Sequence, residues 1–158
     1  METIIVLITT FVITLIISGI RKGKADIFLS GRVAMACMLV LTGTGHFLFT
    51  KGMVLMLPDF IPAREAVVLV TGILEIVAAV ALLSPFVPVL TGWLLIIFFL
   101  LILPSNIYAA IHHVNLKTAT YDGAGPLYLW FRVPLQLLFI GWVYFFIVRH
   151  KRRAPATG

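Results

Sequence analysis

Residues 66–83 read AVVLVTGILEIVAAVALL, an apolar run with a single carboxylate, Glu75, near its middle. On a helix, steps of three and four residues gather the small and polar groups of this run on one face. That face holds Val68, Thr71, Gly72, Glu75, Ala78, Ala79 and Leu82. Small residues let helices approach closely in lipid, so we expect this face to pack against other helices. An ionisable group at membrane depth is costly, and Glu75 should therefore face protein and have a partner.

The composition places the whole chain in a membrane. Of its 158 residues, 61% are hydrophobic and 11% are charged. A helix needs about 20 mostly apolar residues to span a bilayer. Four further apolar runs approach this length, at residues 3–20, 33–49, 89–111 and 126–148. These runs are unbroken and do not alternate in polarity, which favours spanning helices over a barrel. The sequence thus predicts an all-α, polytopic transmembrane protein.

We divide the chain into three parts. Residues 1–24 are an N-terminal spanning helix that a basic cluster ends, residues 31–148 are a four-helix membrane bundle, and residues 149–158 are a basic tail. Residues 26–32 read as a short polar connection. Residues 51–64 are too short to span and are interrupted by two prolines. We expect this last segment to lie at the interface or to form a lid, with Met56 or Phe60 over the polar groups described below.

Basic residues predict the orientation, because Lys and Arg concentrate on the cytoplasmic side of membrane proteins. With the N-terminus outside, eight basic residues lie inside: Arg21, Lys22, Lys24, Arg32, Arg149, Lys151, Arg152 and Arg153. Three lie outside: Lys51, Arg64 and Lys117. The sequence therefore predicts a cell-membrane protein with a cytoplasmic C-terminus. The net charge of +6 sits beside the spans, where it meets membrane lipid, and it is no sign of nucleic-acid binding.

Polar side chains from four predicted spans fall at similar depth. A helix rises about 1.5 Å per residue, which places Glu75 and Gln136 near the middle of the membrane. His46, Asn106 and Arg132 fall in the outer half. These five residues form the candidate ligand-binding layer. We expect Arg132 to pair with Glu75, because neither charge is stable alone in hydrocarbon. Asn106 is expected to bond backbone near the Pro104 kink, and Gln136 to bond Glu75 or Arg132.

The order of several short motifs resembles the DoxX-like family of small four-helix membrane proteins. The motifs are His46-Phe47, the proline-rich residues 57–62, Gly72-x-x-Glu75, Pro104-x-Asn106 and Arg132-x-Pro134-x-Gln136. The resemblance covers residues 33–146, so the first span lies outside it. It implies membrane-linked redox work, since some members resemble a quinone-reducing thiosulfate oxidoreductase subunit. Others accompany oxidative-stress or maturation systems. The chain has one cysteine, Cys37, and so lacks an internal dithiol pair.

Three functions follow as alternatives. The first is a redox-associated membrane subunit that binds a quinone or another small apolar ligand near the outer leaflet, beside a partner oxidoreductase subunit. The second is a non-catalytic scaffold or partner anchor, whose polar layer only sets helix packing. The third is an enzyme acting on a lipid-soluble substrate with Glu75 as acid or base. We expect no metal site, and no haem, because His112 and His113 lie past the end of their span.

The charge pattern makes the topology testable. A reporter fused after Gly158 should be cytoplasmic, and the same reporter inserted at Thr118 should be external. Reporter activity in intact cells measures both positions. The opposite pair of results would reverse the orientation and with it the assignment of each polar group to a leaflet.

Overall fold

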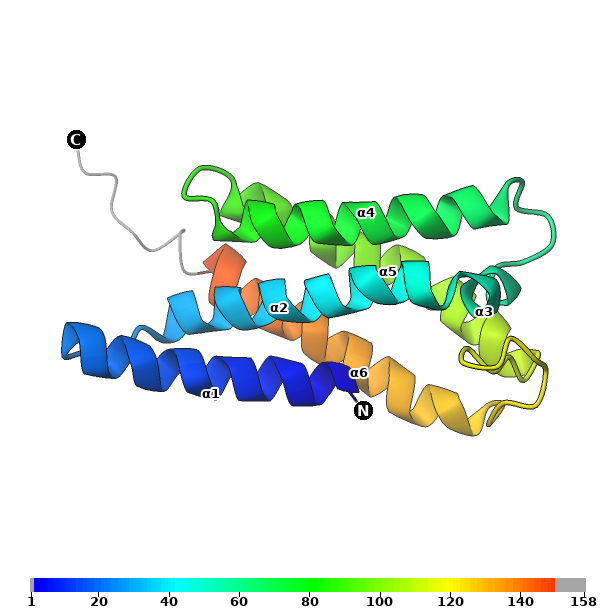
Figure 1. The fold of residues 1–158 in the computed structure, drawn as a ribbon, viewed down its shortest axis with the longest axis horizontal. Coiled ribbons are helices and arrows are strands. Elements are labelled where there is room, and N and C mark those ends of the chain that lie inside the picture. The colour runs from blue at the N-terminus through cyan, green and yellow to red at the C-terminus, as the bar shows by residue number, and fades with distance from the viewer. Residues whose placement is uncertain (1, 150–158) are drawn as a thin grey trace.

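The structure, a computed structural model, describes residues 2–149 and consists of helices joined by short connections (Figure 1). The helices are α1 (Glu2–Lys22), α2 (Ile27–Leu48), α3 (Thr50–Leu55), α4 (Arg64–Leu83), α5 (Pro88–Ile111) and α6 (Leu127–Val143), with α6 continued by the π-helical turn η1 (Tyr144–Val148). Within the described range, five segments are long and apolar enough to cross a membrane: α1, α2, α4, α5, and α6 with η1. The prediction of an all-helical chain with five helices long and apolar enough to cross a membrane is confirmed.

The long helices share two ends (Figure 1). At one end residues 84–87 join α4 to α5, and the connection from α1 to α2 lies there too. We call this the hairpin end. At the other end lie α3 and residues 112–126, which we call the loop end. Most of the predicted basic tail, residues 150–158, lies outside the described residues.

Helix α2 begins earlier than the sequence indicated. Residues 26–32 were expected to be a polar connection, but Ile27 is already helical. Asp26 is the reason, because its side chain accepts a hydrogen bond from the Leu29 backbone N–H at 2.9 Å. An aspartate in this position satisfies an N–H group that the first turn leaves free. Arg32 therefore belongs to a spanning helix rather than to a loop.

Arg32 caps the C-terminus of α4, at the hairpin end. Its guanidinium donates to the Leu82 carbonyl oxygen, from Nε at 2.9 Å and from Nη2 at 2.6 Å. Nη2 also donates to the Ser84 carbonyl oxygen at 3.0 Å. The last carbonyls of a helix lack partners within it and carry partial negative charge, so a cation stabilises them. This contact ties α2 to α4 at one end.

Glycines bring α2 and α4 together farther along. A Cβ built on Gly72 would lie 2.6 Å from the His46 Cβ and 3.0 Å from the Gly43 backbone oxygen. A Cβ on Gly43 would lie 2.9 Å from the Gly72 oxygen. Only residues without a Cβ allow this approach, which is how helices gain close packing in lipid. The small face predicted for α4 is confirmed, since Val68, Gly72, Glu75, Ala79 and Leu82 are its buried residues.

Helix α1 packs against α2 and against α6 with η1. Phe11 meets the Trp142 ring edge-on, with 5.1 Å between centroids, and also contacts Phe146. Trp142 in turn donates from Nε1 to the Gly31 carbonyl oxygen at 3.0 Å. A buried indole N–H needs such an acceptor. The aromatic contacts thus join α1, α2 and α6 into one packed region.

The close helix crossing predicts a sharp difference between two glycines. Gly72→Ala should destabilise the protein by about 1–3 kcal/mol, because its Cβ has no room beside His46. Gly141→Ala on α6 is the matched control, since nothing lies within 4 Å of a Cβ there. Denaturation in detergent, followed by circular dichroism, measures both free energies of unfolding. Equal stability of the two variants would show that α2 and α4 do not cross at Gly72.

Candidate functional site

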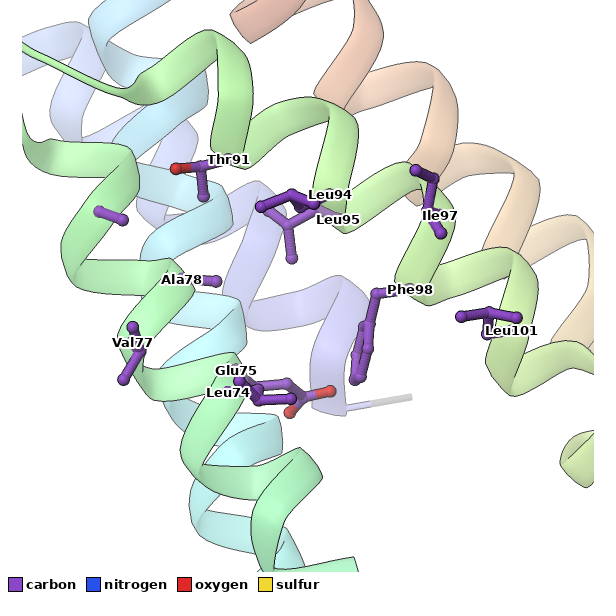
Figure 2. A pocket seen from close by; sticks show the side chains of 11 residues that line it. Leu74, Glu75, Val77, Ala78, Thr91, Leu94, Leu95, Ile97, Phe98 and Leu101 are labelled. Carbon is purple, nitrogen blue, oxygen red and sulfur yellow. The ribbon is translucent and has the colours of Figure 1, made fainter. Parts of the chain in front are cut away.

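A cleft of about 330 Å³ separates parts of α4 and α5, and Glu75 stands on its wall (Figure 2). The other lining residues are apolar apart from Thr91: Leu74, Val77, Ala78, Ala81, Leu94, Leu95, Ile97, Phe98 and Leu101. Several of these side chains, including Val77, Leu94 and Leu101, are more than half exposed at the surface of the helices. In a membrane that surface meets hydrocarbon, so the cleft opens toward lipid. Its size suits a small molecule.

The Glu75 carboxyl group is buried without a full set of partners. The residue is 5% exposed, and its Oε2 atom has no hydrogen-bond partner. The Thr42 hydroxyl is near enough to interact with the Glu75 carboxyl group, but its hydrogen bonds run to the Met38 and Leu39 carbonyl oxygens, each 3.2 Å from Oγ1. A hydroxyl has only one hydrogen to donate. Oε2 is therefore an acceptor without a donor.

His46 is the nearest ionisable neighbour of Glu75. Its Nδ1 lies 3.7 Å from Glu75 Oε2 and 3.0 Å from the Thr42 carbonyl oxygen. A carbonyl oxygen only accepts, so Nδ1 carries the hydrogen and donates it to Thr42. His46 thus stands beside the carboxylate without donating to it. The glycine crossing of α2 and α4 causes this closeness, because Gly72 lies directly against the His46 side chain.

The predicted ion pair of Glu75 and Arg132 does not form as a direct contact, although Arg132 is near enough to interact with Glu75 through its charge. Of the described residues, only His46 comes within ion-pairing distance of Glu75. Arg132 instead donates from Nε to the Asn106 Oδ1 atom at 3.3 Å and lies over the Tyr128 ring. Glu75 and Arg132 lie at similar depth along their helices. Glu75 belongs to α4, which packs against α2, whereas Arg132 belongs to α6, which bonds to α5. Equal depth indicated that they were neighbours, whereas the rotation of α6 directs Arg132 toward α5.

Asn106 and Gln136 join α5 to α6. Asn106 Nδ2 donates to Gln136 Oε1 at 3.2 Å, and Gln136 Nε2 donates to the Phe99 carbonyl oxygen. Gln136, rather than Asn106, therefore meets the backbone about one turn before Pro104. A proline opens the helix turn that precedes it, which leaves carbonyls there accessible to a neighbouring helix. The expected bond from Gln136 to Glu75 is not formed, because the Gln136 amide is used on α5.

The five predicted residues thus divide into two groups. His46 and Glu75 lie together on α2 and α4, while Asn106, Arg132 and Gln136 form a hydrogen-bonded cluster on α5 and α6. Only Glu75 lines the cleft. The three clustered residues satisfy one another, as a structural network does.

The cleft does not lie where the lid prediction required. It runs from Glu75 toward the hairpin end, whereas residues 51–64 lie at the loop end (Figures 1 and 2). Phe60 is 85% exposed and Met56 does not line the cleft. Helix α3 packs instead against residues 112–126, where Gly52 touches the Leu116 carbonyl group. The prediction of a lid over the ligand site is wrong, because the site and the segment occupy opposite halves of α4.

Among the lining residues, Glu75 alone was identified from the sequence, and the whole contribution of α5 was missed. Phe98 and Thr91 belong to the apolar run of α5, and nothing in its pattern distinguishes the face that turns to α4. Their positions depend on how α5 is rotated, which its uniformly apolar sequence does not determine. Within residues 2–149 no three His, Cys, Asp or Glu side chains are grouped as metal ligands.

Comparison with known proteins assigns the chain to a family. The family described as "Domain of unknown function (DUF8561)" matches residues 35–147, which is more than half of the sequence, and the chain belongs to it. No curated protein and no solved structure matches the chain. The family description states no activity, so the resemblance to the DoxX-like family stays a prediction.

The polar cluster can be tested by double-mutant cycles. Asn106→Leu should cost about 1–3 kcal/mol, because it leaves Gln136 Oε1 and Arg132 Nε without partners. Arg132→Met should couple with Asn106→Leu more strongly than with Glu75→Gln. Unfolding free energies in detergent give all the coupling energies. Stronger coupling between Arg132 and Glu75 would restore the ion pair predicted from depth.

Proposed function

We propose that this protein binds a small lipid-soluble molecule inside the membrane, in the cleft between α4 and α5. One observation carries the proposal: a buried carboxylate with an unpartnered oxygen stands on the wall of an apolar cleft. Buried polar groups are almost always satisfied, and ionisable groups within a membrane usually serve a function. A ligand that brings a polar atom to Glu75 would supply the missing partner.

The proposal includes a membrane arrangement. Helices α2, α4, α5 and α6 form a four-helix core, α1 is added on its outside, and the N-terminus faces out of the cell membrane. Arg21, Lys24 and Arg149 support this orientation, because they flank the helices at the hairpin end. In this arrangement the cleft lies in the inner half of the membrane, close to the membrane centre. The outer-leaflet site expected from the sequence is replaced by one in the other half.

A quinone is the ligand that the DoxX-like resemblance suggests, with a redox-associated role beside a partner oxidoreductase subunit. A quinone ring is flat and apolar and carries polar oxygens at two edges. Such a ring fits a cleft with hydrocarbon walls and one carboxyl group. The remaining clustered residues, Asn106, Arg132 and Gln136, then hold α5 and α6 in place.

A scaffold function is the second candidate, and the hydrogen bonds of that cluster favour it. The Asn106 side chain and the Gln136 amide group already form hydrogen bonds between helices α5 and α6. A protein built only to anchor a partner would need such bonds and no ligand. It would not need an unpartnered carboxylate on a cleft, and this difference separates the two functions.

Filling the cleft tests ligand binding. Decylubiquinone should raise the melting temperature of the purified protein in lipid nanodiscs, because a ligand that binds the folded state stabilises it. Ala78→Phe should abolish that rise by occupying the cleft. Val70→Phe is the matched control, since Val70 is exposed on the same helix and does not line the cleft.

Quinones extracted with the protein from native membranes provide a second measurement. Mass spectrometry of the extracts should detect lipid-soluble compounds in wild type and Val70→Phe. The same compounds should be missing from Ala78→Phe. Identical extracts from all three proteins, with no thermal shift in any, would contradict ligand binding and favour the scaffold.

A further inference from the structure

We propose that the cleft between α4 and α5 selects lipophilic organic cations, that is, apolar molecules that carry a single positive charge. This inference rests on the proposed function and names the chemical class of its ligand. It distinguishes a cationic ligand from a neutral quinone by the charge of the wall.

Glu75 is the only ionisable group on the wall. Of the described lining residues, just Glu75 and Thr91 are polar. The Thr91 hydroxyl is already used, because Oγ1 donates to the Val87 carbonyl oxygen at 2.8 Å. A ligand in the cleft therefore meets one acidic group and otherwise hydrocarbon. Such a wall has no group that would attract an anion.

No side chain of residues 2–149 donates a hydrogen bond to Glu75 Oε2. His46 gives its Nδ1 hydrogen to Thr42 and remains 3.7 Å from Oε2. Arg132 is near enough to interact with Glu75 through its charge, but it makes no direct contact with the carboxyl group and donates its Nε hydrogen to Asn106. A carboxylate at low dielectric gains most from a full positive charge, because the Coulomb energy increases as the dielectric constant decreases. A cationic ligand would supply that charge.

Phe98 adds a second feature that suits a cation. Figure 2 shows its ring pointing from α5 into the part of the cleft that the Glu75 carboxylate enters from α4. The face of an aromatic ring attracts cations, most strongly where water is excluded. A positive group between the two would meet a carboxylate on one side and a ring on the other. Leu94 and Leu101 extend the α5 wall for the apolar body of the ligand.

Depth excludes ligands with large polar heads. Glu75 lies near the middle of α4, far from either end of the spanning segment. A phospholipid head drawn to that level would lose its hydration, which is costly in hydrocarbon. A compact cation with its charge spread over an apolar body reaches the same level at much lower cost. The cleft volume of about 330 Å³ agrees with a ligand of that size.

Three tetraphenyl compounds test charge at constant shape. Tetraphenylphosphonium is a cation, tetraphenylsilane is neutral, and tetraphenylborate is an anion. Binding of each radiolabelled compound is measured on the full chain in nanodiscs of zwitterionic lipid, with empty nanodiscs as background. We expect saturable binding of the phosphonium, binding of the neutral silane that is at least tenfold weaker, and no binding of the borate. Because its charge does not change with pH, any effect of a variant reports on the protein.

Matched variants locate the site. Glu75→Gln keeps the size of the side chain and should weaken phosphonium binding at least tenfold. Glu65→Gln removes an exposed carboxylate from the start of the same helix and should leave binding unchanged. Phe98→Leu should weaken binding several-fold, and it provides a test even if Glu75→Gln fails to fold. Circular dichroism and gel filtration establish folding of each variant.

Two other outcomes would each overturn the inference. Equal binding of phosphonium and silane, blocked by Ala78→Phe but not by Glu75→Gln, would show an apolar site without charge selection. The proposed function would then stand and the cation would be wrong. Absence of saturable binding for all three compounds and for decylubiquinone would remove both the inference and the proposed function.

Discussion

The close crossing of α2 and α4 at Gly43 and Gly72 is the contact on which the rest of the structure depends. In lipid no hydrophobic force drives helices together, so their association relies on tight packing and on hydrogen bonds. The glycines provide the packing, and the bonds from Arg32 to the end of α4 provide a second tie. Together they fix the rotation of α4 about its axis. That rotation places Glu75 beside His46 and at the edge of the α4–α5 cleft.

Helix α5 is held from its other side. Its Asn106 side chain and its Phe99 carbonyl group both bond to Gln136 of α6. These bonds draw α5 toward α6, and a cleft remains between α5 and α4. Two helix pairs, each tied internally by polar contacts, thus meet along a line that is less well filled.

Glu75 is costly for a protein that uses its polar layer only for packing. Removing one partner of a buried polar pair costs about 1–3 kcal/mol, and more when the group is charged. Asn106, Arg132 and Gln136 avoid that cost by bonding to one another or to backbone. Glu75 does not, since Oε2 lacks a donor. Within one layer, three residues thus have hydrogen-bond partners that join helices, and the Glu75 Oε2 atom has none.

The sequence by itself determined the helices and which face of α4 is buried. Long apolar runs mark the spanning segments because each must satisfy its own backbone in lipid. The spacing of Val68, Gly72, Glu75 and Ala79 marks the face because a helix repeats every 3.6 residues. In the sequence Asp26 was recognised only as a polar residue and not as the cap of a helix. The predicted start of α2 was therefore too late. Counting residues along each predicted helix also gave the depth of its polar side chains. By this count five polar residues lie at similar depth.

Only the tertiary structure decided which of those residues meet. Depth fixes one coordinate, whereas contact also requires the rotation of each helix and its choice of neighbour. For α4 the small residues set the rotation, but for α5 almost every position is apolar, and its sequence leaves the rotation open. Packing against α6 resolves it, turning Asn106 to Gln136 and Phe98 to the cleft. Arg132 and Glu75 therefore lie at similar depth on different helix pairs, because contacts between helices, rather than positions along them, select the partners.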